Sequence, residues 1–134
     1  MTQGLVSLHR YYIWANKMRT HFDEIISNGY PTAGAEIEAT LYMSYWYGGL
    51  YVVIEGWQQL GLSDRSIDEL LCSSNVKLLK RYRHGVFHFQ KNYFDERFVE
   101  FMRDGKDAVS WVRNLNLEFG RYFLEKGRAK YPSS

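Results

Sequence analysis

The sequence of 134 residues contains one cysteine, Cys72, so no disulfide bond can form within the chain. This excludes a disulfide-stabilised secreted domain, and we expect a protein of the reducing cytoplasm. The first residues lead into an amphipathic pattern without the features of a signal peptide. The longest uncharged run, 39–54, is shorter than the ~20 apolar residues that a membrane span needs. We therefore expect no membrane association.

Several other signals are missing. No segment alternates between apolar and polar residues with a period of two, and hairpin turn signals are absent. There is no glycine-rich loop of the kind that holds nucleotide phosphates, and Cys72 lies in no nucleophile motif. The net charge of +2 is too small to indicate a nucleic acid partner by itself. We expect no cofactor, and local clusters of charge are more informative than the whole-chain balance.

Aromatic residues are abundant, at 17% of the chain. They predict a core and a dimer interface built from rings. The alternative is that some rings stack on nucleic acid bases, which also requires an exposed basic groove beside them.

Apolar residues recur three and four residues apart, which predicts helices. The predicted helices span 4–27, 35–60, 65–72, 75–91, about 98–102 and 109–126. The fold class is therefore all-α, an antiparallel bundle of four to six helices in a single domain, 1–134. Gly48 and Gly49 fall inside the second helix, where they indicate close approach of another backbone or a bend; a break in the helix is the alternative.

The predicted helix 75–91 has two distinct faces. Its apolar face is expected to meet the core and consists of Leu78, Leu79, Tyr82, Val86 and Phe89. Its second face carries cationic or titratable side chains three or four residues apart, namely Lys77, Arg81, His84, His88 and Lys91. No acidic residue lies between positions 77 and 91. This helix is the candidate site of function.

Structural explanations compete with a functional one. Glu55 follows the uncharged run and needs a partner, for which Arg81 or Arg83 is a candidate, and His88 could be a satisfied core histidine. His84 and His88 are four residues apart and could share a metal ion. A third ligand could come only through folding, from the segment that holds His21, Asp23 and Glu24. We expect no metal.

The segment Arg83-His84-Gly85-Val86-Phe87-His88 resembles the signature of the HEPN superfamily, an arginine followed after four to six residues by a histidine. The resemblance implies the helical HEPN fold, metal-independent cleavage of RNA, and a homodimer in which both motifs line one cleft. It also implies the roles of the residues: His88 is the acid or base, Arg83 binds the phosphate, and His84 assists or orients.

Helix geometry raises one question about these roles. Arg83 and His88 project about 140° apart on an ideal helix, whereas Arg81 and His88 are nearly eclipsed. Arg81 could therefore share the role, the helix could bend at Gly85, or the long Arg83 side chain could reach around. We expect the substrate to be contacted by Arg81, Lys77, Lys91 and Tyr82.

The functional hypothesis is a HEPN-like endoribonuclease in which the 2′-hydroxyl of RNA attacks the adjacent phosphate. Histidine suits the proton transfer near neutral pH, and a guanidinium can stabilise the developing charge. The protein could be a toxin or defence protein with an antitoxin-like partner. The alternative is a non-catalytic HEPN-like module that binds nucleotides or protein.

Overall fold

The computed structural model describes residues 2–29 and 32–130, with side chains up to residue 127, and contains six α-helices in that part of the chain. In chain order the elements are α1 (Gln3–Ser27), α2 (Ala33–Gln59), α3 (Arg65–Leu70), α4 (Asn75–Phe87), the 3-10 helix η1 (Glu96–Phe98), α5 (Glu100–Asp104) and α6 (Ala108–Lys130). These residues include no strand, so the predicted all-α class and helical bundle are confirmed. None of their helices is long and apolar enough to cross a membrane.

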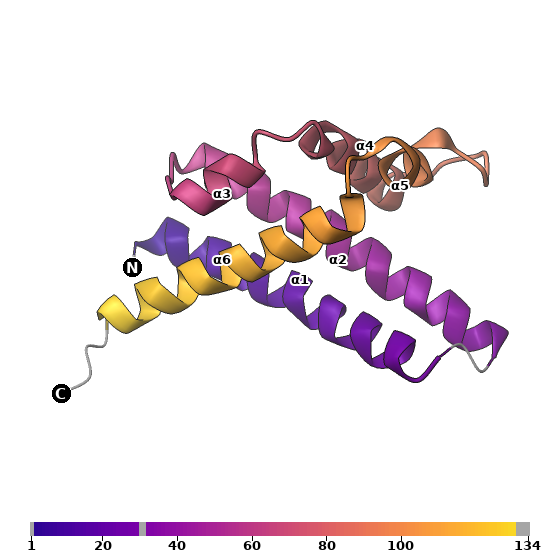
Figure 1. Ribbon diagram of the computed structural model, residues 1–134, viewed down its shortest axis with the longest axis horizontal. Coiled ribbons are helices and arrows are strands. Elements are labelled where there is room, and N and C mark those ends of the chain that lie inside the picture. The colour runs from indigo at the N-terminus through magenta and orange to yellow at the C-terminus, as the bar shows by residue number, and fades with distance from the viewer. Residues whose placement is uncertain (1, 30–31, 131–134) are drawn as a thin grey trace.

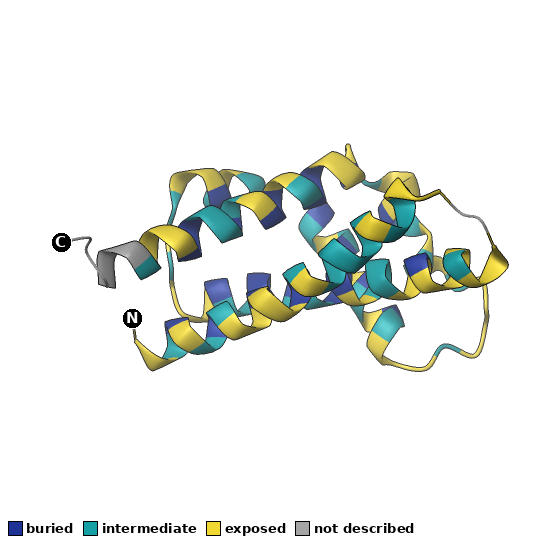
Figure 2. Cartoon of the chain, turned by 90° about the horizontal axis from the view of Figure 1, so that it is seen from below, coloured by how far each residue is buried: buried dark blue, intermediate teal, exposed yellow. Residues whose placement is uncertain are grey.

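The helices α1 and α2 form a long hairpin that α6 crosses, while α3, α4 and α5 lie along the other edge of α2 (Figure 1). Buried residues line the surfaces that these helices turn toward each other (Figure 2). The core is rich in rings, and its largest fully buried aromatic side chains are Trp46, Trp57, Phe101, Phe119 and Phe123. Packing in the core thus explains many of the aromatic residues of the chain.

The glycines of α2 permit close packing on two sides, and the helix runs through them without a break. A Cβ atom on Gly48 would lie 2.7 Å from the ring of Phe87 in α4, and one on Gly49 would lie 3.2 Å from Cβ of Ala15 in α1. Both distances are shorter than ordinary contacts. The predicted close approach of another backbone is confirmed at Gly49, whereas the neighbour of Gly48 is a side chain; the alternative of a broken helix is wrong.

The end of α4 differs from the prediction. The helix stops at Phe87, four residues earlier than expected, and His88 is already extended, with φ −123° and ψ 124°. The helix continues through Gly85, whose lack of a side chain lets η1 pack against α4, since a Cβ there would lie 3.1 Å from Cβ of Arg97. The chain leaves the helix to bring η1 to this position. Phe89 consequently lies outside the helix and is 93% exposed, so its predicted place in the core is wrong.

Candidate functional site

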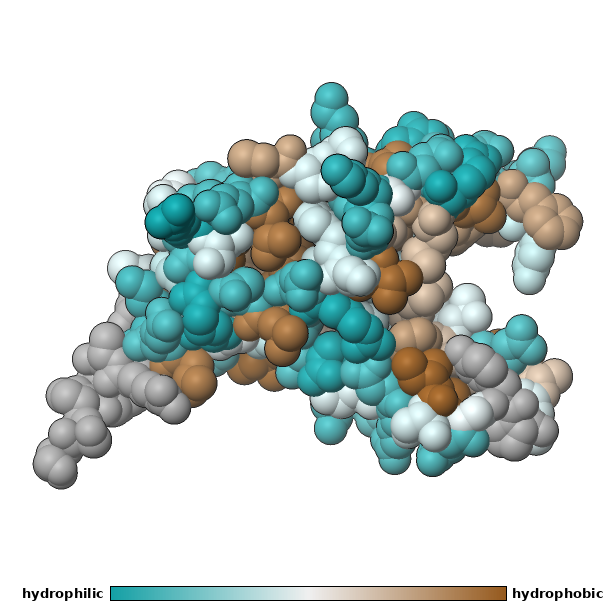
Figure 3. All heavy atoms as spheres, viewed as in Figure 1, coloured by the Kyte–Doolittle hydropathy of each residue, from teal (hydrophilic) through white to brown (hydrophobic). Residues whose placement is uncertain are grey.

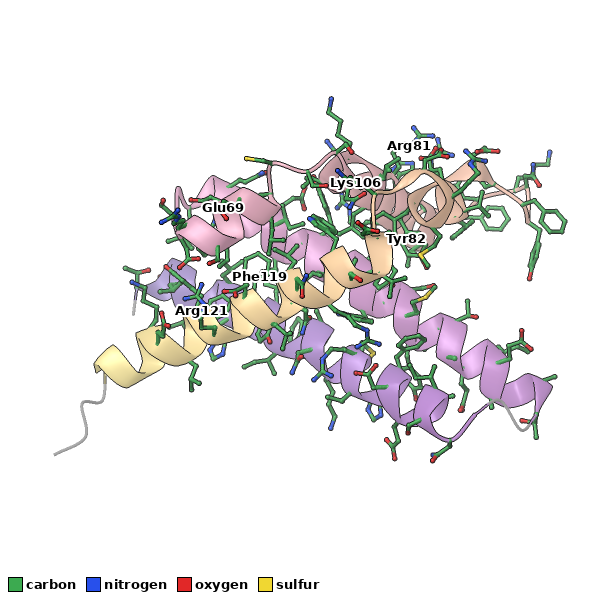
Figure 4. The ribbon with its side chains drawn as sticks, in the orientation of Figure 1. Glu69, Arg81, Tyr82, Lys106, Phe119 and Arg121 are labelled. Carbon is green, nitrogen blue, oxygen red and sulfur yellow. The ribbon has the colours of Figure 1, made fainter. Side chains whose placement is uncertain are left out.

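We call the region formed by the last two turns of α4 and the loop 88–95 the α4-end site. Its floor includes Tyr82, which is 2% exposed and shares a hydrogen bond of 3.0 Å with the hydroxyl of Ser44 in α2. Figure 4 shows Tyr82 turned toward α2, whereas Arg81 leaves α4 on the outer side. A base cannot stack on a ring buried in this way. Tyr82 therefore shapes the site from below, in contrast to the predicted contact with substrate.

Arg83 points toward α2. Its Nη1 atom lies 3.5 Å from Oε1 of Glu55, and its guanidinium lies 5.0 Å from the centre of the Tyr51 ring. The Nε atom is buried without a hydrogen-bond partner among the described residues. The predicted pairing of Arg83 with Glu55 is confirmed. The guanidinium is thus neutralised by a carboxylate of α2, although its hydrogen bonds are incomplete.

Arg81 extends from the opposite flank of α4 and pairs with Glu100 of α5. About half of its side chain remains exposed. Both candidate arginines therefore have a carboxylate partner, and the two partners lie on different helices. Neither guanidinium is directed at His88 in this arrangement.

The two histidines of the motif lie together on the surface. The rings of His84 and His88 are stacked, with their centres 4.4 Å apart and their planes 22° from parallel. The backbone N–H of His88 donates to the carbonyl of His84 at 3.0 Å, which holds His88 at the end of the helix. Both residues are exposed, so His88 is not the buried core histidine considered above.

His84 lies in a cationic environment. Desolvation lowers its pKa below 6.5, and the positive charges of His88, Arg97, Arg83 and Arg81 lower it further. The imidazole of His84 is therefore neutral at neutral pH. A neutral imidazole has a free lone pair that can accept a proton, as a general base must, although the nearby positive charges make this imidazole a weaker base.

The loop 88–95 is fixed at its far end by Arg97. The Nη1 atom of Arg97 donates to both carboxylate oxygens of Asp95, at 3.1 and 3.2 Å, and to Oε1 of Gln90 at 3.2 Å. Asp95 also accepts from the backbone N–H of Arg97 at 2.9 Å and thereby caps η1. Nε2 of Gln90 in turn donates to the carbonyl of His88 at 2.7 Å. The loop is held at both ends.

The loop closes one side of a pocket of about 550 Å³ between α2, α4 and η1. Met43, Val86 and Phe98 contribute apolar walls, and His88 borders it. On the loop, Phe89, Tyr93 and Phe94 are 93%, 86% and 78% exposed. Figure 3 shows the molecule hollowed on this side, between the loop and the far end of the α1–α2 hairpin. Exposed rings therefore surround a recess that is largely apolar.

The remaining predicted residues are at the margin of this site. Lys77 and Lys91 are exposed, and neither forms an ion pair with a described carboxylate. His21, considered as a third metal ligand, instead stacks on Tyr42 with ring centres 4.9 Å apart. Within residues 2–29 and 32–127, no three His, Cys, Asp or Glu side chains are grouped to hold a metal ion.

Comparison with protein-family models, with curated proteins and with solved structures finds no match for this chain. The HEPN assignment remains a prediction that rests on the six-residue motif and the helical fold. Sequence reasoning missed Tyr51, Arg97 and the exposed rings of the loop. A signal for the rings existed in the cluster Phe89 to Phe94, which contains two polar residues and a lysine and could have been interpreted as surface rather than core.

Proposed function

We propose that this protein binds single-stranded RNA at the α4-end site and cleaves it, in the manner that the resemblance to HEPN ribonucleases implies. The observation that supports binding is the position of three exposed rings, Phe89, Tyr93 and Phe94, beside two imidazoles and Lys91. Proteins that bind single strands combine aromatic side chains, on which bases stack, with cations that follow the phosphates. The α4-end site has both.

Cleavage would use the stacked histidines. In place of the assisting role that the resemblance gives it, the neutral His84 takes the proton from the 2′-hydroxyl, and the 2′-oxygen bonds to phosphorus. The bond from phosphorus to the 5′-oxygen breaks, and protonated His88 gives that oxygen its proton. The products are a 2′,3′-cyclic phosphate and a 5′-hydroxyl, and no metal takes part in a step. The lowered pKa of His84 keeps its imidazole in the deprotonated form that a base needs.

The part assigned to Arg83 changes in this proposal. Because Glu55 already neutralises its guanidinium, Arg83 binds a phosphate directly only if it leaves that carboxylate. Its Nε atom is buried and has no hydrogen-bond partner among the described residues, so moving the side chain toward a phosphate would break no hydrogen bond at Nε and would let a phosphate oxygen satisfy it. Arg81 contributes charge from the outer flank, with Glu100 as its competing partner.

Binding is tested by fluorescence anisotropy with labelled 12-nucleotide oligo(U) and oligo(A). We expect Phe89→Ala and Phe94→Ala each to weaken binding by about fivefold or more, the loss expected for one stacked base. Trp14→Ala is the matched control, since Trp14 is 56% exposed on α1, away from the loop. Equal losses in the control and the loop variants, or no binding at 50 mM salt, would contradict the proposal.

Cleavage is tested with the same RNAs in EDTA. The wild-type protein is expected to produce 2′,3′-cyclic ends, and His84→Ala and His88→Ala to lose about a hundredfold or more in rate. Binding without cleavage would support the proposed RNA-binding site and contradict the proposed ribonuclease activity. Activity that requires added metal would overturn the mechanism.

A second candidate function is the non-catalytic module, which binds a protein. The apolar walls of the pocket favour it, because they fit an apolar side chain as well as a base. Arg83 neutralised within its own chain also agrees with this candidate. Failure of RNA binding in the anisotropy assay, with the fold intact, would favour it.

The remaining parts of the proposal follow from the resemblance. The protein would act in the cytoplasm as a homodimer that brings two motifs to one cleft, and an antitoxin-like protein would silence it. Exposed apolar side chains on α2 offer surface for such contacts, namely Ile37, Leu41 and Tyr45. Light scattering coupled to gel filtration gives the mass; a monomer at 100 µM would remove the homodimer from the proposal.

A further inference from the structure

A second pocket, of about 390 Å³, lies between α1 and α6 and shares no lining residue with the α4-end site. This volume is at the lower end of the range for small-molecule sites, about 300–1,000 Å³. The side chains that line it include two asparagines and three arginines, Asn16, Asn116, Arg19, Arg113 and Arg121. No catalytic or binding role has been assigned to it above.

One end of this pocket has more positive than negative charge. Arg19 donates to Asp23 at 2.7 Å, and Arg113 donates to the other oxygen of the same carboxylate, also at 2.7 Å. Two guanidiniums thus share one carboxylate, which leaves one positive charge without a partner. A guanidinium has five N–H donors, so donors remain on both arginines beyond those that Asp23 takes.

The end of the pocket that holds these arginines is rigid before any ligand binds. Asn116 is 2% exposed; its Oδ1 accepts from the Trp46 indole at 3.0 Å, and its Nδ2 donates to Asn16 Oδ1 at 3.0 Å. Nε of Arg19 donates to the same Asn16 oxygen at 2.9 Å, and the Arg113 guanidinium lies 5.2 Å from the centre of a Trp46 ring. Side chains held in this way lose little freedom when a ligand arrives, which favours binding.

The other end of the pocket has a different character. Arg121 donates to three carboxylates, those of Asp64, Glu118 and Glu125, and has no charge to offer. Leu117 lies between the two arginines on α6 and Leu124 follows Arg121 by three residues; these leucines are 70% and 55% exposed. The pocket is therefore cationic at one end and apolar along its rim.

We propose that this pocket binds a small organic oxyanion, a carboxylate or a phosphate monoester, whose apolar part lies along Leu117 and Leu124. The anionic group is received by Arg19 and Arg113, which form charge-assisted hydrogen bonds with either kind of oxyanion. The excess of one positive charge is removed when the anion binds. This site is separate from the proposed RNA site and does not depend on it.

The experiment uses the full chain, labelled with ¹⁵N, and three probes with the same ring: phenyl phosphate, benzoate and the neutral benzyl alcohol. Saturable shifts of the Trp46 indole N–H and of the Nε–H of Arg19 are expected with at least one anion and not with benzyl alcohol. The tighter anion identifies the class of oxyanion. Absence of saturable shifts at these groups up to 10 mM, including a case in which only loop 88–95 responds, would overturn the site.

Two variants at the rim sharpen the test. Leu117→Glu places a negative charge one turn from Arg113 and is expected to weaken anion binding about tenfold, the effect of a like charge at this range. Leu117→Gln is the neutral control and should stay within about twofold of the wild type. Leu117 is 70% exposed, so both variants should fold, which the same spectra verify. Equal effects of the two variants would contradict an electrostatic role of the pocket.

Discussion

Two regions of this molecule are rich in arginine, and they differ in how well the arginine side chains are hydrogen-bonded to the protein. We call the contact between α1 and α6 around Asp23 and Asn116 the seam. There Asp23 accepts short hydrogen bonds from Arg19 and Arg113, and Arg19 and buried Asn116 both donate to the Asn16 side chain. At the α4-end site, Arg83 is 3.5 Å from Glu55 and its Nε atom has no partner. The seam network therefore stabilises the fold while its arginines keep spare donors for an anion, whereas Arg83 makes only a long contact and has a buried donor that no described protein group satisfies.

The exposed rings support the same contrast. The seam covers its aromatic side chains, so that Tyr12 donates to the carbonyl of Asn116 at 3.2 Å from a buried position. The α4-end site instead leaves Phe89 and Phe94 in solvent. Because exposed rings contribute little to folding, their position on a loop that is held at both ends agrees with the proposed role in binding.

The largest effect is expected from breaking the seam at Asn116. Asn116→Leu keeps the approximate shape but leaves the buried indole N–H of Trp46 without an acceptor, which should lower the free energy of unfolding by about 2–3 kcal/mol. Urea denaturation followed by circular dichroism measures the change. Asn114→Leu, at an exposed position of the same helix, should change it by less than about 0.5 kcal/mol. Similar losses in both variants would show that the network does not hold the seam.

The second effect concerns the charge of Asp23. Burial alone would raise the pKa of Asp23, but the hydrogen bonds and charges of Arg113 and Arg19 outweigh it and lower the pKa below 3.8. The carboxylate therefore stabilises the fold above pH 4, and this stabilisation is lost as the pH falls through the lowered pKa. Asp23→Asn should cost about 1–2 kcal/mol at pH 7, and its difference from the wild type should shrink toward pH 2.

Glu24→Gln provides the control for this pH dependence. Glu24 is the next residue on α1, is exposed and belongs to none of the ion pairs described above. Its unfolding free energy should follow that of the wild type at every pH. If Asp23→Asn shows a loss that does not vary between pH 7 and pH 2, the stabilising effect of Asp23 does not come from its charge.

The contrast between the regions also explains what the sequence could predict. Helices with apolar residues three and four apart were placed within a few residues. Glu55, an isolated acid after a long uncharged run, narrowed its partner to Arg81 or Arg83, and the structure shows Arg83. The end of α4 was missed because Tyr82, Val86 and Phe89 keep helical spacing beyond the last helical residue. Spacing along the chain carries no information on η1, whose packing against Gly85 requires the chain to turn.

The seam could not be predicted at all. Asp23 and Arg113 are 90 residues apart in the chain, and Asn16 and Asn116 are 100 apart, so no local pattern links them. Each residue alone resembles an ordinary polar residue on an amphipathic helix. Only the crossing of α6 over α1 brings them together (Figure 1).

A smaller effect is expected from the pair Arg83 and Glu55. A double-mutant cycle with Arg83→Met and Glu55→Gln should give a coupling energy below about 1 kcal/mol, because the contact is long and the Glu55 side chain is 44% exposed. Urea denaturation of the four proteins measures it. A coupling energy of about 3 kcal/mol would mean that this pair stabilises the fold as much as the Asn116 network does. Arg83 would then have no part in the binding proposal.

The smallest effect on stability, and the sharpest test of the contrast, is expected at the loop. Phe94→Ser removes a ring that is 78% exposed, so the free energy of unfolding should change by less than about 0.5 kcal/mol. If Phe94 binds a base, RNA affinity should nevertheless fall about fivefold or more in the same protein. Loss of binding without loss of stability separates a residue retained for a ligand from one retained for the fold. A loss of stability comparable to that of Asn116→Leu would mean that the exposed loop is itself part of what holds α4 in place.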